Sequence, residues 1–579
     1  MLQKKPFDMS SKWNLKYWAF LYFPCIIVFI IIFLYFPVIQ APFLFDDSSS
    51  IVDNPAIHSL DLKKIYAFKP LRFIGYLSFA LNFYFSKVNT LSYHLVNISV
   101  HILYILFSFL FIKTLWQTPS GKAVNLSTNE KTLLALATVF ILAVHPLSTF
   151  AVSYIVQRLA ALTALFYVGT LFFYLKARLS QNIPGKISWS LFFILFLTCS
   201  LFTKQNSFTI FPQLFFLELF CFNLTPRKRL ALILFLPVLV LSFYISIRYN
   251  FIDLDEIRTL TMETTQISRI EYLSTQFSVL CFYLKLFFYP INLALDYQFP
   301  VLKSITNPGV FIPALILTAI LLIALWVATK KKFRLIAYGI FFYFTAISIE
   351  SSIIPIRDAI FLHRTYLPNL GLAFTSILLT YIILKKMNFN RYGLISIFFI
   401  CAVILSGFTF KTNLIFQTPG KVWARVLEVS PGHLRGYVNI SRDHLDNKLY
   451  DKAIAVCTKA ISINLGSARI YNNRGVAYKH TQKFDKALLD YKKAIELDPK
   501  YADVYNNCGA VYYIQNEFDK AILNYNKAIV IDPTNAVYYN NRGAVYKLEK
   551  KYNQAISDYT QAIHLNPLFD EAFHNRGLL

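Results

Sequence analysis

Charged residues are scarce in this sequence. They make up 15% of its 579 residues, whereas hydrophobic residues make up 56% and aromatic residues 17%. A soluble globular protein carries roughly 25% charged residues, and a mean hydropathy of +0.47 is far above what such a protein shows. The composition therefore excludes a soluble globular protein and indicates a protein with several membrane spans.

Cysteine is also scarce. None of the seven residues has the spacing of a metal site or of a disulfide framework. Five lie inside apolar runs, where a free cysteine behaves as a small buried apolar residue: Cys25, Cys199, Cys221, Cys281 and Cys401. The pattern predicts neither a structural metal centre nor a disulfide scaffold.

Acidic residues are rare in the apolar part of the chain. The net charge is +26, and 37 of the 57 basic residues but only 16 of the 31 acidic residues precede residue 434. The basic excess falls in short tracts between apolar segments rather than on one continuous face, so nucleic acid is not an expected partner. Such tracts are instead the usual signal of membrane orientation.

The basic tracts predict a topology for residues 1–412. Four lysines precede the first apolar run and no signal-peptide cleavage site follows it, so the N-terminus is predicted to be cytosolic. The tracts Arg227–Arg229, Lys330–Lys332 and Lys385–Lys386 are all cytosolic if residues 271–290 form a re-entrant or interfacial helix. The alternative is a twelfth span at 271–290, with a cytosolic C-terminus. The favoured scheme is an all-α bundle of about eleven spans, with a first outer loop at 41–91: 17–38, 92–112, 131–146, 159–175, 187–203, 206–222, 230–247, 310–329, 335–350, 369–384 and 393–410.

Tetratricopeptide repeats follow this membrane part. Glycines recur every 34 residues from Gly475 to Gly577, and prolines do so from Pro499 to Pro567, which is the tetratricopeptide period. The sequence predicts a junction at 413–433 and an α-solenoid at 434–579 on the outer side. Its units are 434–467, which is degenerate, then 468–501, 502–535 and 536–569, and a partial unit at 570–579.

An asparagine pair recurs in the first helix of each complete repeat. Amides both donate and accept hydrogen bonds, so Asn473, Asn507 and Asn541 are predicted to bind an extended acceptor peptide on the concave surface. The alternative is that these are solvated residues at the start of a helix.

Two adjacent carboxylates, Asp46 and Asp47, follow the first span at the predicted outer interface. A charge at this depth is a functional candidate by default. It would act as a general base on an acceptor hydroxyl, or hold a divalent metal against a phosphate. The alternative is that both are ordinary interfacial acids that end a helix.

Five cations on the predicted outer face run against the orientation bias: Arg72, Arg158, Lys204, Arg357 and Arg364. A lipid-linked phosphate would explain them, because arginine and lysine are the usual phosphate ligands. The alternative for each is snorkelling to lipid headgroups. Nearby histidines are possible supporting residues, but no third metal ligand appears at helical spacing: His94, His101, His145 and His363.

Several segments, in order, resemble the transmembrane and tetratricopeptide-repeat (TMTC-like) O-mannosyltransferases and their bacterial relatives, which belong to the GT-C glycosyltransferases. They are "FLFDDSSSIVDNPAI", the block that ends in "YHLVNISVHIL", "HPLSTFAVSYIVQR", "LFTKQNSFTIFP", "YLKLFFYPINLALDYQFP" and "FLHRTYLPNLGLAF", followed by the repeats. The chain departs from the family pattern at His363, where a Glu is usual, and at Gln157, where a Gly is frequent.

The resemblance implies a GT-C fold with an acid of the first outer loop at the sugar-transfer site, here Asp46 or Asp47. It implies a polyprenyl or dolichyl phosphate sugar, mannose-like, as donor, with its phosphate held by Arg158, Lys204 and Arg364. The acceptor would be a protein hydroxyl. The expected location is a bacterial inner membrane with periplasmic repeats, or alternatively an endoplasmic reticulum membrane with luminal repeats. No cofactor is certain, although a divalent metal is compatible with the acid pair.

Two other functions fit the same sequence. A non-catalytic scaffold would use the spans to anchor the repeats, and would need neither the acids nor the outer cations. A flippase or ligase for lipid-linked saccharides would share a cation-lined cavity. Convergence of the acid pair and Arg364 on one cavity would favour the transferase over the scaffold.

Overall fold

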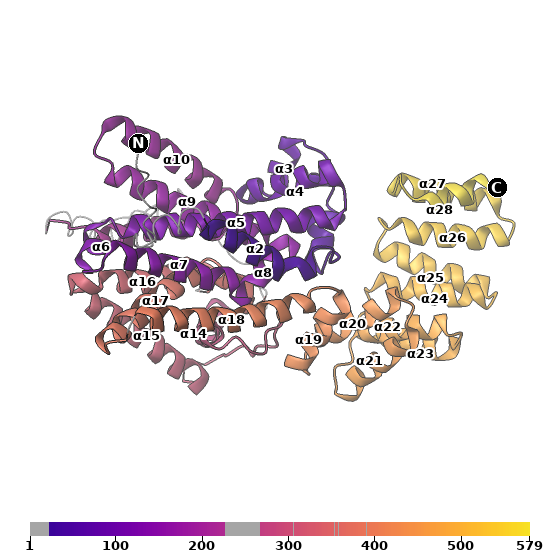
Figure 1. Ribbon diagram of the computed structural model, residues 1–579. Helices are drawn as coiled ribbons and strands as arrows, with labels where there is room; N and C mark the ends of the chain where they lie inside the picture. Colours follow the sequence, from indigo (N-terminus) through magenta and orange to yellow (C-terminus); the bar gives the residue numbers. More distant parts are fainter. Residues whose placement is uncertain (1–21, 226–266, 305, 352–353, 357, 390) are drawn as a thin grey trace, which may run out of the picture. The chain divides into compact units, whose positions relative to one another are not determined.

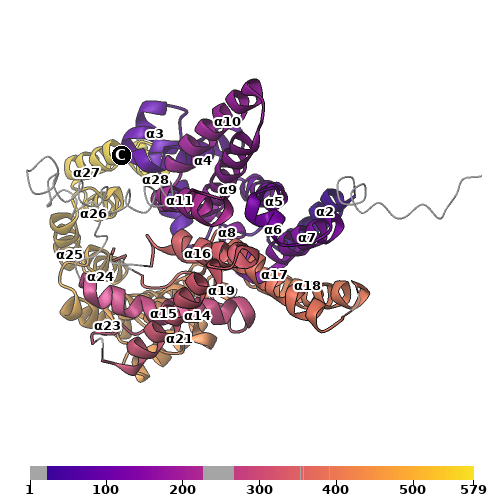
Figure 2. The same ribbon diagram turned by 90° about the vertical axis from the view of Figure 1, so that its left-hand side faces the viewer.

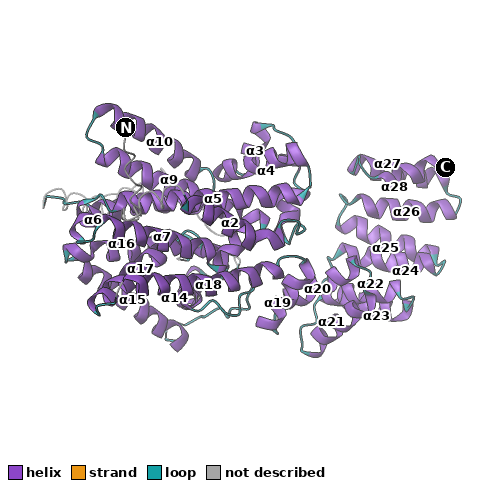
Figure 3. Cartoon of the chain, in the orientation of Figure 1, coloured by secondary structure: helices purple, strands orange, loops and turns teal. Residues whose placement is uncertain are grey.

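The computed structural model describes residues 22–225, 267–304, 306–351, 354–356, 358–389 and 391–579. These residues form helices and loops and contain no strand (Figure 3). They divide into two compact units, Met1–Thr418 and Pro419–Leu579. The predicted all-α membrane bundle followed by a repeat solenoid is confirmed as a fold class.

Helices fill the first unit and pack along one another (Figures 1 and 2). α9 packs between α5 and α10, and α17 packs between α7 and α16. Helix starts follow from sequence, as α7 begins at a capping box in which Ser127 and Glu130 satisfy each other's backbone N–H groups. The bounds are α2 Phe23–Tyr35, α5 Thr90–Leu115, α7 Thr128–Val144, α9 Arg158–Leu179, α10 Ile183–Leu201, α11 Ile210–Cys221, α15 Pro308–Ala328, α16 Arg334–Ile347, α17 Asn369–Lys386 and α18 Arg391–Ile415.

Six helices among the described residues are long and apolar enough to cross a membrane, or seven if α7 and the helix after its 53° bend form one span. Only 6%, 17% and 22% of the apolar stretches of α10, α15 and α18 are buried. Exposed apolar surface of this extent requires lipid around it.

The predicted count of eleven spans stays a prediction. The segments predicted at 206–222 and 335–350 form α11 and α16, which are helices of 12 and 14 residues. The span predicted at 230–247 and the basic tract Arg227–Arg229 lie outside the described residues.

The segment predicted to be re-entrant or interfacial is one uninterrupted helix, α14, Arg269–Phe288. It also starts at a capping box, formed by Ser268 and Glu271. Its buried tyrosines, Tyr272 and Tyr283, face the loop that follows α16. Its position in the membrane stays a prediction.

The first outer loop has its own small core. It contains α3, Leu62–Phe68, and α4, Phe73–Ser86. Ile51, Ile57 and Ile65 are fully buried against Phe79 and Leu159 of α4 and α9. The loop therefore packs firmly on the helix bundle, although it is not predicted to cross the membrane.

The second unit is a stack of antiparallel helix pairs. Gly475, Gly509 and Gly543 face the rings of Tyr491, Tyr525 and Tyr559, and a Cβ added at each would lie within 2.5, 2.7 and 2.9 Å of a ring carbon. The period thus reflects a close approach between the two helices of a repeat. The bounds are α19 Pro419–Val429, α20 Leu434–Asp446, α21 Tyr450–Ser462, α22 Ala468–His480, α23 Phe484–Leu497, α24 Ala502–Ile514, α25 Phe518–Ile531, α26 Ala536–Leu548, α27 Tyr552–Leu565 and α28 Asp570–Gly577.

The boundary between the units divides the predicted junction at 413–433. Residues up to Thr418 belong to the first unit, and α19 belongs to the second. α19 packs on α20 and adds one helix before the predicted start of the repeats at residue 434.

Candidate functional site

The carboxylate of Asp47 is fully buried. Its Oδ2 accepts a hydrogen bond from the backbone N–H of Leu44 (2.8 Å), and its Oδ1 accepts one from the backbone N–H of Val156 (2.7 Å). Burial raises the pKa of Asp47 to about 7, although the two N–H groups lower it. Asp47 thus ties the outer loop to η6, Ile155–Gln157, the turn before α9.

Asp46 is only partly buried. Its backbone N–H donates to the hydroxyl of Tyr154 (3.0 Å). The residue before it, Phe45, has a φ of 43°, which is uncommon for a residue with a side chain and is found preferentially at functional sites. Of the two acids, only Asp46 is not fully buried.

Arg158 is fully buried beside this pair, and its guanidinium is held by protein groups on all three nitrogens. Nε donates to Asn97 Oδ1 (2.6 Å), one terminal nitrogen to the carbonyl of Tyr93 (3.0 Å), and the other to the carbonyl of Ser78 (3.2 Å). The guanidinium also lies 4.6 Å from the ring centroid of Phe79. Through these contacts Arg158 joins α4, α5 and α9, and its predicted binding of phosphate stays a prediction.

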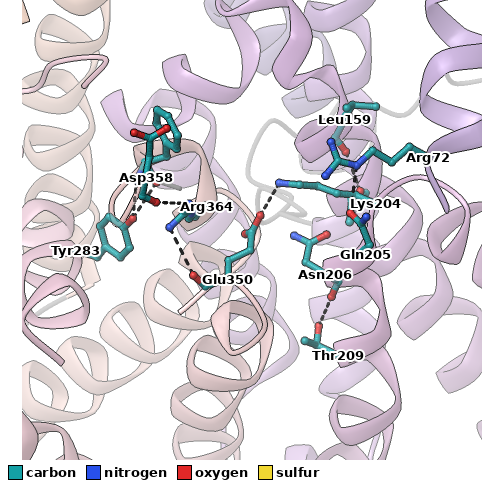
Figure 4. Close-up of polar contacts among 12 residues, drawn as sticks. Arg72, Leu159, Lys204, Gln205, Asn206, Thr209, Tyr283, Glu350, Asp358 and Arg364 are labelled. Carbon is teal, nitrogen blue, oxygen red and sulfur yellow. Dashed lines mark hydrogen bonds and ion pairs between the residues drawn. The ribbon is translucent and has the colours of Figure 1, made fainter. Parts of the chain in front are cut away.

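A second group of charges surrounds Glu350, which follows α16 (Figure 4). Lys204 Nζ lies 2.5 Å from Glu350 Oε1, and both side chains are about nine-tenths buried. Arg72 is next to Lys204, because its Nε donates to Gln205 Oε1 (3.1 Å). Arg364 approaches Glu350 from the other side. We call Arg72, Lys204, Arg364 and Glu350 the cation cluster.

Arg364 lies in η9, Leu362–Thr365. Its guanidinium donates to the carbonyls of Asp358 (2.8 Å) and Ala359 (3.1 Å). α14 supports the same loop, since Tyr272 donates to the carbonyl of Glu350 (2.7 Å) and Tyr283 to that of Phe361 (3.0 Å). α14 therefore fixes the loop that carries two members of the cluster.

His363 lies next to Arg364 and is buried. Burial, and then the positive charges of Lys204, Arg364 and Arg72, hold the pKa of His363 well below its usual value. Its ring is therefore neutral and adds no charge to the cation cluster. Arg357, predicted as a supporting cation, lies outside the described residues.

The contacts thus sort the predicted residues into two groups, one around Asp46, Asp47 and Arg158 and the other the cation cluster. α4 joins them, because Arg72 precedes its first residue while Ser78 accepts a bond from Arg158. Arg72 and Ser78 are six residues apart, which corresponds to about 9 Å along a helix axis.

The outer histidines bind backbone or hydroxyl groups. His94 Nε2 lies 3.1 Å from the carbonyl of Ala41, His145 Nε2 lies 3.0 Å from that of Phe287, and His101 Nδ1 lies 2.6 Å from the hydroxyl of Tyr366. These contacts orient loops and helices. In the part of the chain that the structure describes, no three His, Cys, Asp or Glu residues are grouped as a metal site.

The asparagines of the second unit form a ladder between repeats. Asn507 Nδ2 donates to Asn472 Oδ1 (2.9 Å), and Asn541 Nδ2 donates to Asn506 Oδ1 (2.8 Å). Asn473 Nδ2 instead donates to Ser441 Oγ (2.9 Å) of the degenerate repeat. Part of the ladder lines a groove of about 330 Å³: Asn472, Asn473, Asn506 and Asn507, together with Arg442, Asp446, Tyr450, His480, Tyr501 and Asp503.

Two residues of the membrane unit that contact the predicted charges, Tyr154 and Glu350, were not predicted from the sequence. Tyr154 gives no signal in the sequence, since it is one tyrosine in an aromatic-rich chain. Glu350 could have been found, because it is one of only 16 acids before residue 434 and ends an apolar run. A buried lysine such as Lys204 also requires a counterion.

Comparisons with known proteins agree with the division into two units. Tetratricopeptide repeat models match residues 468–501, 490–522 and 536–569, and a TPR repeat model matches residues 509–549. Protein O-mannosyl-transferase F38B6.6 of Caenorhabditis elegans is 24% identical over 439 residues, which cover 72% of this chain and 59% of that protein. Mouse Protein O-mannosyl-transferase TMTC3 is 29% identical over 154 residues, 24% of this chain and 15% of that protein.

The chain is similar in sequence to these protein O-mannosyl-transferases and carries tetratricopeptide repeats. It spans less than two thirds of the length of the relatives that it matches. Among solved structures, the crystal structure of MamA is 26% identical, with 26% of this chain and 87% of that chain covered and a TM-score of 0.24. The match to the worm protein covers 72% of this chain and so extends beyond the repeat unit, which begins at Pro419, into the first unit.

Proposed function

We propose that this chain is a membrane glycosyltransferase that moves a mannose-like sugar from a polyprenyl or dolichyl phosphate to a hydroxyl of a protein acceptor held by the repeats. Two relatives named as protein O-mannosyl-transferases support the transferase activity. The lipid phosphate donor is supported by the cation cluster, and this is the observation that carries the proposal.

The cation cluster has the composition of a phosphate site. Three cations surround one carboxylate, so the cluster keeps a positive charge when Glu350 is ionised. Arginine and lysine are the preferred ligands of phosphate oxygens. Lys204 and Arg72 would bind the phosphate, while Arg364, which donates to two loop carbonyls, would contribute mainly its charge.

Asp46 is the better candidate for the base of the acid pair. Asp47 has both oxygens bonded to backbone N–H groups and is shielded from substrate, so its role is to position the loop. Asp46 is partly exposed on the same turn. In the transfer, the bond between the anomeric carbon and the phosphate oxygen breaks and a bond to the acceptor oxygen forms. Asp46 takes the hydroxyl proton, and the phosphate leaves on its lipid beside Lys204.

The repeats would supply the acceptor. The groove of about 330 Å³ is lined by asparagine, arginine, aspartate and tyrosine side chains, whose polar atoms suit an extended peptide. We place this groove and the acid pair on the same outer side of the membrane, with the N-terminus in the cytosol.

The test is transfer by the full chain in lipid vesicles, from a radiolabelled mannosyl polyprenyl phosphate to a Ser/Thr-rich peptide. Asp46→Asn should reduce the rate by at least 100-fold, since a positioned base contributes about 10²–10⁴. Asp53→Asn is the matched control, because Asp53 is an exposed acid of the same loop. Absence of transfer by the wild type would favour the scaffold, and equal rates for Asp46→Asn and Asp53→Asn would remove Asp46 from the mechanism.

A further inference from the structure

Glu350 has one oxygen that no group of the described residues satisfies. Its Oε1 pairs with Lys204 at 2.5 Å. Its Oε2 is buried and has no hydrogen-bond partner among the described residues. A buried carboxylate oxygen without a donor is costly, and such atoms are rare in native proteins. The cation cluster therefore contains an acceptor that is available to a ligand.

The backbone around Glu350 is held firmly. Tyr272 of α14 donates to its carbonyl at 2.7 Å, and Arg364 lies 3.5 Å from the same oxygen. With Lys204 fixing Oε1, the direction of Oε2 is set by three contacts from different parts of the chain. A preset acceptor of this kind is typical of a recognition site.

The ligand of Oε2 must be a hydrogen-bond donor that accompanies an anion. A phosphodiester has no proton to give, and its charge repels the carboxylate. A hydroxyl of a sugar attached to that phosphate is a donor within a few bonds of the anion. A lipid phosphate that has lost its sugar has no such hydroxyl and carries up to two negative charges, because its second pKa is about 6.

We propose that Glu350 accepts a hydrogen bond from a hydroxyl of the donor sugar, and that the cation cluster thereby distinguishes the sugar-loaded lipid from the spent lipid phosphate. This inference rests on the proposed function. Glu350 is a specificity residue in this scheme, since it recognises the loaded donor before transfer and repels the product afterwards.

The experiment measures the affinity of the full chain in nanodiscs for two probes, mannosyl polyprenyl phosphate and polyprenyl phosphate. The wild type should bind the mannosyl ester at least tenfold more tightly. Glu350→Gln should reduce this preference at least fivefold, mainly by tightening the binding of polyprenyl phosphate. Glu130→Gln is the control, because Glu130 also pairs with a lysine, Lys385, at 2.6 Å, although that pair is more exposed and lies on the predicted cytosolic side.

The outcomes separate the two proposals. If the wild type binds both probes, and Glu350→Gln prefers the mannosyl ester as strongly as Glu130→Gln does, Glu350 does not recognise the sugar. The proposed function then stands. If the wild type binds neither probe, the proposed function and this inference both fail.

A second measurement needs no variant, in case Glu350→Gln does not fold. The wild type should bind the phosphate ester of a pyranose without hydroxyls at least tenfold more weakly than the mannosyl ester. Equal affinity for the two esters would overturn the inference.

Discussion

Asp47 Oδ1 accepts a hydrogen bond from the backbone N–H of Val156 at 2.7 Å, across 109 residues of sequence. This contact joins the first outer loop to the turn before α9. The two adjacent acids therefore have different surroundings, since Asp47 is fully buried and Asp46 is partly exposed. Because Asp47 is buried, the stability of the protein should depend on the protonation of this carboxylate.

Asp47→Asn should become more stable relative to the wild type as the pH rises from about 4 to about 7, because the contribution of Asp47 falls over this range while that of buried His363 rises. Burial raises the pKa of Asp47 from 3.8 to about 7, so between these values the folded protein binds one more proton than the unfolded chain. The slope is then about −1.4 kcal/mol per pH unit for this group. The measurement is the midpoint of thermal unfolding in detergent from pH 4 to pH 8, with Asp53→Asn as control. If the stability of the wild type and that of Asp47→Asn change with pH in the same way over this range, the carboxylate is not buried.

Arg158→Met should destabilise the protein, whereas Arg72→Gln should mainly weaken donor binding. Removal of Arg158 leaves the side-chain oxygen of Asn97 and two carbonyls without their donor, at about 1–3 kcal/mol for each buried group. Arg72 is half-buried and bonds to Gln205, so its loss should raise the donor Kd about tenfold, the worth of one charge-assisted contact. Thermal unfolding and donor affinity are measured on both variants. If Arg158→Met instead weakens donor binding and Arg72→Gln instead destabilises the protein, Arg158 belongs to the phosphate site.

Gly509→Ala should destabilise the repeats by about 1–3 kcal/mol, because the added Cβ would lie 2.7 Å from a ring carbon of Tyr525. Gly577→Ala is the matched control, since no atom lies within 4 Å of a Cβ there. It should be neutral or stabilising, because alanine favours a helix over glycine by about 1 kcal/mol. Hydrogen exchange of α24 and α25 in the intact protein reports the change. Equal protection in both variants would mean that the tyrosine moves aside at no cost.

Asn507→Ala should weaken binding of an acceptor peptide about three- to tenfold without unfolding the repeats. Its amide bonds to Asn472 in the polar groove, and one neutral hydrogen bond contributes about 0.5–1.5 kcal/mol. Asn524→Ala is the control, because the amide of Asn524 bonds to the carbonyl of Lys520 in its own helix. Peptide affinity is measured by fluorescence anisotropy on the full chain. An equal loss in both variants would point to a general effect on the repeats rather than to the groove.

Sequence patterns predicted the class of the fold because they are one-dimensional. The apolar runs, the basic tracts and the 34-residue period are local or periodic along the chain, and they indicated the membrane bundle and the solenoid. Helices α11 and α16 are shorter than their apolar segments. Packing and flanking loops, rather than hydropathy, set those ends.

By itself, the sequence determined that this is a membrane protein with tetratricopeptide repeats. It also identified a set of acids and cations as candidates for the functional site. Only the tertiary structure decided which groups these charges contact. The partner of Lys204, Glu350, is 146 residues away, and Arg158 is held by three residues of α4 and α5 that are 61 to 80 residues distant. No local pattern encodes such pairings, since they depend on burial and on contacts between segments that are far apart in the sequence.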